Sequence, residues 1–201
     1  MFDFTSRQES FDFDTDKNLV VIGAGGIGWN FIKYAIQAGI NKIIVFDHDK
    51  LEPHNLSRID APLSVIGMNK ATLIKSFANQ MRPDAECRSF PFKFNPDLVD
   101  LSKVDIIVDC SDRYEAQVEN YRTAKNAGVR YMKLGYDGSH ITIANTVPEW
   151  DATPEAEDNG YTIVPSFISP ASIVASLALY NILTDNYREV SCDIKDLYVF
   201  K

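Results

Sequence analysis

Three observations predict that this 201-residue chain folds as an α/β protein with a doubly wound, mostly parallel sheet. Apolar, β-branched runs alternate along the chain with segments of helical periodicity. The runs lie roughly 20–30 residues apart, the spacing of βαβ units. Most of them are apolar at every position, as in a parallel sheet that helices cover on both faces. A hydrophobic content of 45% suits one core in a chain of this length.

Strands are expected where short apolar runs lie between turn-forming residues. Three runs, NLVVIGA, KIIVFD and DIIVDC, are almost continuously apolar. Residues 86–94 alternate between apolar and polar side chains, and the last run is DLYVF. The expected strands, in chain order, are 18–24, 42–47, 86–94, 105–110, 130–136, 140–146 and 196–200.

Helices are expected where apolar residues recur at helical spacing up to a stop signal. Gly39 and Gly128 stop the first and third, and Pro83 closes the second. The fourth lies in an uncharged segment and is expected to begin after Pro170. The expected helices are 26–38, 69–81, 114–126 and the part of 161–184 that follows Pro170.

The charge balance excludes one class of function. The chain has 20 Lys+Arg against 28 Asp+Glu, a net charge of −8. Non-specific binding to nucleic acid needs a basic face, so no nucleic-acid partner is expected. The three cysteines form no C-x-x-C pair, which indicates a reducing, cytoplasmic compartment and no sulfur-ligated zinc.

The N-terminus is acidic and lacks the apolar core of a secretory signal. The uncharged part after Pro170 is too short to cross a bilayer, so we expect a buried helix of a soluble protein and no membrane partner. We expect a single domain over residues 1–201, with an N-terminal arm over 1–16. Residues 149–160 are polar and acidic, and we expect a flexible crossover loop there.

A glycine motif predicts nucleotide binding. Gly23, Gly25 and Gly28 fit G-x-G-x-x-G between an expected strand and an expected helix, with Gly26 as a further small residue. The helix N-terminus presents free N–H groups to an anion, and Asp47 ends the next strand, where an acid binds ribose hydroxyls. These features predict a Rossmann-like fold, but the same motif serves NAD, FAD and ATP.

A second group of motifs narrows the choice. D-x-D at Asp47 and Asp49 is followed by an acidic turn and by N-L-x-R from Asn55 to Arg58. These motifs have the order and spacing found in one family, and Lys70 in GMNKA, Asp112 in DCSD and the Arg7-Gln8 pair near the N-terminus are further matches to it. On these residues the chain resembles the ThiF/MoeB/HesA family, prokaryotic relatives of ubiquitin-activating enzymes, over nearly its whole length.

The resemblance implies an ATP-dependent adenylyltransferase. Its substrate would be the C-terminal carboxylate of a small ubiquitin-like protein or peptide with a Gly-Gly-type tail, and pyrophosphate would be released. The resemblance assigns Arg58 and Lys70 to the triphosphate, Asp112 to Mg²⁺ and Asn55 to phosphate orientation. It places Asp47 and Asp49 near the ribose. It also puts Arg7 in the partner subunit's site, which implies a homodimer.

The chain departs from the family pattern at several positions. It lacks the two C-x-x-C pairs that bind zinc in many relatives, so no zinc is expected. Residues 149–160 contain no cysteine, so adenylation without an enzyme–acyl intermediate is expected, and Cys192 is an unsupported candidate for that role. Arg113 and Gln117 stand where relatives often have Asn and Arg, which affects the geometry around Asp112.

Other interpretations remain open from the sequence. A nicotinamide-dependent oxidoreductase explains the glycines and Asp47 but not the later motifs. A catalytically degenerate binding subunit explains the missing cysteines. Arg58 and Lys70 are also consistent with ordinary solvated surface charges, and Asp112 with the N-cap of a helix. The acidic segment within 149–160 is consistent with either a solvated loop or a loop that closes over a substrate tail.

Overall fold

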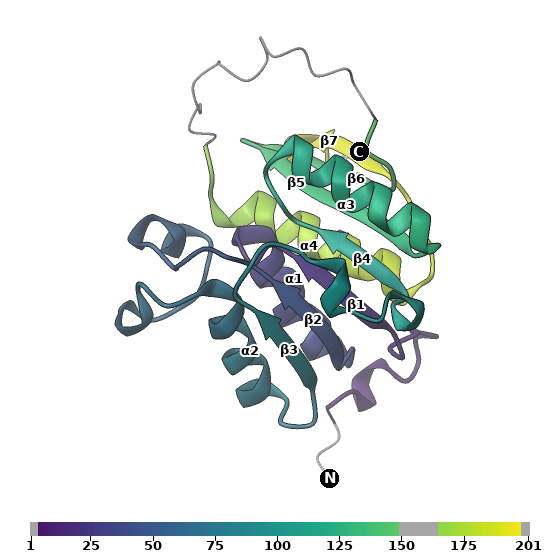
Figure 1. Ribbon diagram of the computed structural model, residues 1–201, viewed down its shortest axis with the longest axis horizontal. Helices are drawn as coiled ribbons and strands as arrows, with labels where there is room; N and C mark the ends of the chain where they lie inside the picture. The colour runs from purple at the N-terminus through teal and green to yellow at the C-terminus, as the bar shows by residue number, and fades with distance from the viewer. Residues whose placement is uncertain (1–3, 149–164, 198–201) are drawn as a thin grey trace.

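In the computed structural model, which describes residues 4–148 and 165–197, seven strands form one sheet in the order β3-β2-β1-β4-β5-β6-β7 (Figure 1). Strands β1 to β5 pair in parallel, and β6 and β7 are antiparallel. The predicted Rossmann-like, mostly parallel sheet is therefore confirmed. The strands are β1 Asn18–Ile22, β2 Lys42–Phe46, β3 Glu86–Phe90, β4 Ile106–Asp109, β5 Arg130–Asp137, β6 His140–Ala144 and β7 Val190–Asp193.

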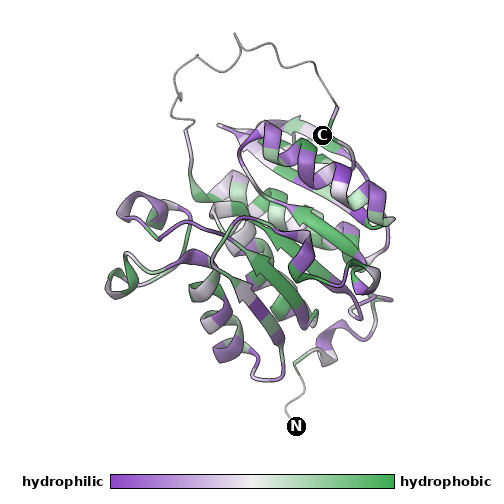
Figure 2. Cartoon of the chain, in the orientation of Figure 1, coloured by the Kyte–Doolittle hydropathy of each residue, from purple (hydrophilic) through white to green (hydrophobic). Residues whose placement is uncertain are grey.

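Helices cover both faces of the sheet. Three of them pack on one face, where α1 contacts both α2 and α4, and α3 packs on the other face against β4 and β5. The four helices are α1 Gly26–Ala38, α2 Lys70–Met81, α3 Tyr114–Ala127 and α4 Ile168–Leu183. A separate apolar cluster covers each face of the sheet. The central strands are therefore apolar at successive positions, because neighbouring side chains point to opposite faces (Figure 2).

The strand register brings the predicted loops to one edge of the sheet. Ile22 at the end of β1 is paired with Phe46 of β2 on one side and with Asp109 of β4 on the other. The chain therefore leaves all three strands at the same level. Because the strand order reverses between β1 and β4, a crevice for a ligand is expected at this carboxyl edge.

The prediction for the last strand was wrong. The final strand is Val190–Asp193, and Asp196 and Leu197 lie in a 3-10 helix, Ile194–Leu197. Residues 198–200 of the predicted strand are outside the described residues. DLYVF resembles a strand more closely than VSCD does, but VSCD is the segment that pairs with the edge of β6. Pairing there depends on backbone hydrogen bonds, and an edge strand needs no apolar run.

The predicted start of the last helix, after Pro170, was also wrong, by three residues. Helix α4 begins at Ile168, so Pro170 lies inside its first turn. A proline is tolerated there because the first N–H groups of a helix have no acceptor within it. No helix in the described part of the chain is both long and apolar enough to span a membrane. The predicted crossover loop, 149–160, lies outside the described residues.

Candidate functional site

The glycine loop, residues 23–28, connects β1 to α1. Gly23 has a φ of +89°, which L side chains rarely adopt, and a Cβ there would lie 3.0 Å from the carbonyl oxygen of Cys110. A Cβ on Gly28 would lie 1.9 Å from the carbonyl oxygen of Gly23. These two glycines are therefore required by the turn and by the packing of α1 on its own loop.

Gly25 and Gly26 differ from the other two glycines. Gly25 is the N-cap of α1, and a Cβ there would meet nothing within 4 Å. The backbone at Gly25 is open, as the close approach of a phosphate requires. A Cβ on Gly26 would lie 2.7 Å from Cδ of Arg58, so Gly26 makes room for the arginine side chain.

Asp47 ties the end of β2 to the glycine loop. Its Oδ2 accepts a hydrogen bond from the N–H of Ala24 at 2.6 Å, and its Oδ1 accepts one from the N–H of Asp49 at 2.7 Å. Burial raises the pKa of this carboxyl, and the two backbone donors oppose the shift. Asp47 is only 7% exposed, so its carboxylate lies at the base of the loop.

Lys70 reaches the same edge from the start of α2. Its Nζ lies 3.3 Å from Oδ2 of Asp49, and the residue is 8% exposed. Asn69, the N-cap of α2, donates from Nδ2 to the carbonyl oxygens of Asp47 and Asp49. The interpretation of Lys70 as an ordinary solvated charge is therefore wrong, because the ammonium is buried beside a carboxylate.

Arg58 lies over the start of α1. Its Nη1 donates to the carbonyl oxygen of His54 at 3.2 Å and to Oγ of Ser57 at 3.4 Å. Within residues 4–148 and 165–197, no carboxylate oxygen lies within 4 Å of an Arg58 nitrogen. A half-buried guanidinium beside a helix N-terminus, with no acidic partner in these ranges, is suited to an anionic ligand.

Asn55 supports the loop that contains Arg58. Its side chain is 4% exposed, and Oδ1 accepts from the N–H of Glu52 at 3.0 Å. The Glu52 side chain accepts in return from the N–H of Asn55, a capping box that opens the 3-10 helix Pro53–Ser57. The backbone N–H of Arg58 donates to the carbonyl oxygen of Asn55. The observed contacts of Asn55 thus fix the local chain, and its role toward phosphate is still a prediction.

Asp112 follows β4 at the same edge and is exposed. The N-cap of α3 is Arg113, without a side-chain hydrogen bond, so the interpretation of Asp112 as the N-cap was wrong. Gln117 donates from Nε2 to the carbonyl oxygen of Ser111 and so holds the loop from α3.

Asp109, the last residue of β4, is not among the predicted site residues, yet it is the buried centre of this loop. Its side chain accepts hydrogen bonds from Oγ of Ser111, Nδ2 of Asn120 and Oη of Tyr131, at 2.6, 2.8 and 2.8 Å. Asp109 is 0% exposed. Its position in the sequence could have predicted it, because Asp109 ends an apolar run just as Asp47 ends KIIVFD.

Arg7 does not belong to this cluster. It is exposed in a 3-10 helix, Ser6–Gln8. The neighbouring Thr5 lies beside Gly39 at the C-terminal end of α1, where a Cβ on the glycine would be 3.1 Å from Cγ2 of Thr5. A helix of 13 residues is about 20 Å long, so Arg7 lies at the far end of α1 from the glycine loop of its own chain.

Oxygen ligands for a cation lie at the carboxyl edge. In the described ranges, the group of three potential metal-binding residues is Asp47, His48 and Asp49, whose ligand atoms lie within 4.8 Å of one another. Asp112 is not part of this group. An exposed carboxylate such as Asp112 suits Mg²⁺, which retains several waters and needs only one or two protein carboxylates beside phosphate oxygens.

Burial disfavours the thiolate form of Cys87 and Cys110. Burial raises the pKa of the Cys87 thiol to about 11, and burial together with the charge of Asp109 raises the pKa of Cys110. Cys192 lies on β7, four strand spacings or about 19 Å from β1. Cys110 adjoins the glycine loop, whereas Cys192 lies at the far edge of the sheet.

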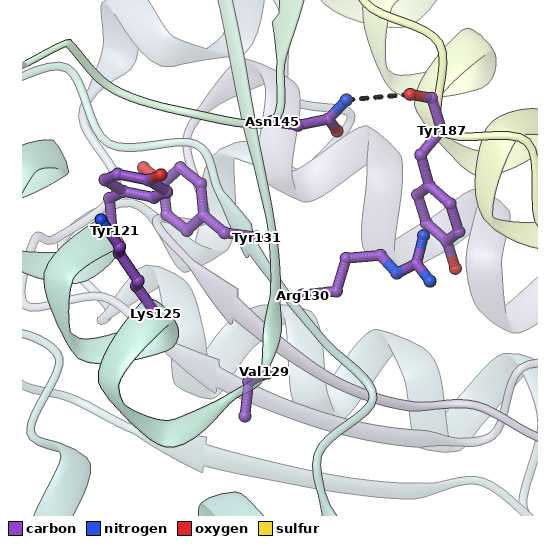
Figure 3. A pocket seen from close by; sticks show the side chains of 7 residues that line it. All are labelled: Tyr121, Lys125, Val129, Arg130, Tyr131, Asn145 and Tyr187. Atoms are coloured by element: carbon purple, nitrogen blue, oxygen red, sulfur yellow. Dashed lines mark hydrogen bonds between the residues drawn. The ribbon is translucent and has the colours of Figure 1, made fainter.

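A pocket of about 360 Å³ lies elsewhere, between the end of α3 and the start of β5 (Figure 3). Arg130, which opens β5, stacks on Tyr187 with its guanidinium carbon 3.6 Å from the ring centre, and Asn145 donates to the Tyr187 carbonyl oxygen. This is the amino edge of the parallel strands. No predicted site residue lines it, so we place the candidate site at the carboxyl edge, where the charged groups converge.

The chain matches the family described as the ThiF family over residues 15–187. Among curated relatives, the chain is 31% identical over 110 residues to the ATP-dependent ubiquitin transferase-like protein Cap2 of Enterobacter hormaechei subsp. hoffmannii. That match covers 53% of this chain and 18% of the relative. It is 29% identical over 141 residues to ubiquitin-like modifier-activating enzyme 5 of Drosophila erecta, covering 63% and 34%.

A third relative is the adenylyltransferase and sulfurtransferase UBA4 of Kluyveromyces lactis, 33% identical over 114 residues, with 55% of this chain and 26% of the relative covered. The chain thus matches between about a fifth and a third of the length of these relatives. Among solved structures, E. coli MccB with AMPCPP and MccA superimposes with a TM-score of 0.71 at 19% identity. That superposition covers 89% of this chain and 64% of MccB, and it shows a shared fold.

Proposed function

Because the chain belongs to the ThiF family, we propose that it is an ATP-dependent adenylyltransferase for the C-terminal carboxylate of a small ubiquitin-like protein or peptide. Two relatives are named as an activating enzyme and an adenylyltransferase, and the MccB crystals contained an ATP analogue and MccA. The match covers only part of these proteins, so the activity is proposed for the matched region.

One observation supports this function above the others: two cations lie at the carboxyl edge of a net-acidic chain. Arg58 packs on Gly26 at the start of α1, and Lys70 is buried beside Asp49, which Asp47 links to the glycine loop. A dinucleotide cofactor accounts for the glycines and Asp47, but it leaves both cations without a role.

The proposed reaction follows from this charge arrangement. A carboxylate oxygen of the substrate tail attacks the α-phosphorus of ATP, the bond to the bridging oxygen of the β-phosphate breaks, and pyrophosphate leaves as an anion. Arg58 and Lys70 would stabilise the negative charge that develops on the leaving group. The phosphates would lie at the open backbone of Gly25 and the N-terminus of α1.

The remaining polar residues receive the roles that the resemblance implies. Asp47 and Asp49 would lie near the ribose, and Asn55 would orient phosphate while it caps its own turn. Asp112 would hold Mg²⁺ together with phosphate oxygens, and the ion would neutralise charge on the triphosphate. We expect no zinc and no enzyme–acyl intermediate on this chain.

The direct test is ATP–pyrophosphate exchange with radiolabelled pyrophosphate, Mg-ATP and a panel of small ubiquitin-like proteins that end in Gly-Gly. We expect exchange with the cognate member and none with its version lacking the last glycine. Tight calorimetric binding of NAD(H) without binding of Mg-ATP would support the oxidoreductase instead. Binding of Mg-ATP without exchange across the panel would favour a binding subunit.

Arg7 provides a test of the proposed homodimer. Because Arg7 lies at the far end of α1, we propose that it acts in the partner subunit's site. Arg7→Ala and Arg58→Ala should each be inactive in exchange, whereas their mixture should recover about a quarter of wild-type activity. With random pairing, half of the dimers are heterodimers, and each heterodimer has one intact site and one site that lacks both arginines. An inactive mixture whose heterodimers are verified by mass spectrometry contradicts action in trans.

A further inference from the structure

We propose that a clasp of four side chains, Trp29, Asn30 and Lys33 of α1 with Asp60, holds Arg58 in place over the glycine loop. Asn30 and Asp60 are then positioning residues for the nucleotide. This inference rests on the proposed function, because it assigns to Arg58 the binding of an ATP phosphate. It extends the proposed function to Asn30 and Asp60, which lie outside the motifs that the chain shares with the family.

Asn30 connects α1 directly to the backbone of Arg58. Its Nδ2 donates to the carbonyl oxygen of Gly26 at 2.7 Å and to the carbonyl oxygen of Arg58 at 3.1 Å. Asn30 is 2% exposed, in a helix interior, where asparagine is a poor helix former and an unused amide is costly to bury. The two acceptors explain why a polar side chain is accommodated there.

Asp60 forms the second attachment, two residues after Arg58. Its Oδ1 accepts from Nε1 of Trp29 at 2.7 Å, and its Oδ2 accepts from Nζ of Lys33 at 2.5 Å. Partial burial of Asp60 opposes ionisation, but the hydrogen bonds from Lys33 and Trp29 outweigh it and lower the pKa of the carboxyl. Trp29 is 0% exposed, so one donor is fixed in the core.

The clasp has two consequences for Arg58. The chain is attached to α1 at residues 58 and 60, and Ile59 between them is 2% exposed, so the backbone of the arginine cannot shift independently of the helix. The clasp also occupies both oxygens of Asp60, the acid nearest to Arg58 in the chain. The guanidinium is thereby kept from pairing with Asp60 and stays available for an anion.

The test measures Mg-ATP affinity by calorimetry and thermal stability by circular dichroism. Asn30→Ala and Asp60→Ala should each weaken Mg-ATP binding by about 5–20-fold, the loss of one or two positioning hydrogen bonds. In an Arg58→Met background the same substitutions should change affinity less than twofold, because their effect depends on the guanidinium. A merely structural role would give the same loss in both backgrounds.

A matched control is Asn181→Ala. Asn181 is also a buried helical asparagine, 7% exposed, and it donates to the carbonyl oxygen of Arg188 at 2.8 Å, at the far end of α4. It should lower the melting temperature without changing Mg-ATP affinity. If Asn30→Ala does not fold, Asp60→Ala still tests the clasp, because the Asp60 side chain is 59% exposed.

The outcomes separate the clasp from the proposed function. Suppose that the wild-type protein binds Mg-ATP. The clasp alone is overturned if both variants keep wild-type Mg-ATP affinity. It is also overturned if each variant lowers the affinity as much in the Arg58→Met background as in the wild-type background. A loss in only one variant overturns the positioning role of the other residue. Wild-type protein that does not bind Mg-ATP overturns the clasp and the proposed function together.

Discussion

Replacing Gly28 by alanine is expected to disrupt the glycine loop and abolish nucleotide binding. The added Cβ would lie 1.9 Å from the carbonyl oxygen of Gly23 and 2.9 Å from its carbonyl carbon. Both atoms are backbone, so no side chain can move aside, and either α1 or the loop after β1 must shift. Overpacking of this kind typically costs about 1–3 kcal/mol and sometimes more. We expect the free energy of unfolding to fall by about 3 kcal/mol, roughly 6–12 °C in melting temperature.

Gly25→Ala is the matched variant that separates binding from folding. Its φ of −73° is accessible to alanine, and the new methyl group would meet nothing within 4 Å. Stability should therefore stay the same or rise by up to about 1 kcal/mol. Mg-ATP affinity should still fall at least about tenfold, because the methyl group occupies the space where a phosphate approaches the backbone. A Gly25→Ala protein with wild-type affinity would contradict our placement of the phosphates.

Replacing Arg58 by methionine is expected to lower the rate of ATP–pyrophosphate exchange by about 10²–10³-fold. This is the usual effect of removing one preorganised charge that faces a developing anion. Methionine retains an apolar chain to pack on Gly26, where Cγ and Cδ of Arg58 now lie. The free energy of unfolding should therefore change by less than about 0.5 kcal/mol.

Arg88→Met provides the control for Arg58→Met. Arg88 is an exposed arginine on β3 that lies over the Phe90 ring, 5.5 Å from its centre, and it is not one of the residues proposed for the site. It changes the net charge equally, so it should leave the exchange rate within a factor of two. Equal losses in the two variants would show that overall charge, and not the position of Arg58, supports the reaction.

The linear motifs could be predicted because each lies within a few residues. Gly23 to Gly28, the D-x-D pair and N-L-x-R each combine a turn with the groups that the turn presents. Parallel pairing then places the ends of β1, β2 and β4 at one edge, which the alternation of strands and helices already predicts. The role assigned to each residue from the resemblance stays a prediction.

Contacts between distant residues could not be predicted. Asp109 accepts from Tyr131, 22 positions later, and Asp60 accepts from Trp29, 31 positions earlier. Asn30 and Asp60 fit no motif, and an asparagine in an amphipathic helix gives no sign of the carbonyl group that it meets. In its own chain Arg7 lies at the far end of α1, and the place in the partner subunit's site that the resemblance implies for it stays a prediction.

The sequence by itself determined the fold class and the glycine loop, and it supplied the charged residues that we propose for the site, because periodicity and turn chemistry act over short stretches of chain. The tertiary structure alone decided the last strand, the burial of Lys70, the Asp109 centre and the clasp on Arg58. Each of these depends on which donor meets which acceptor after the helices pack, and packing is a property of the whole core.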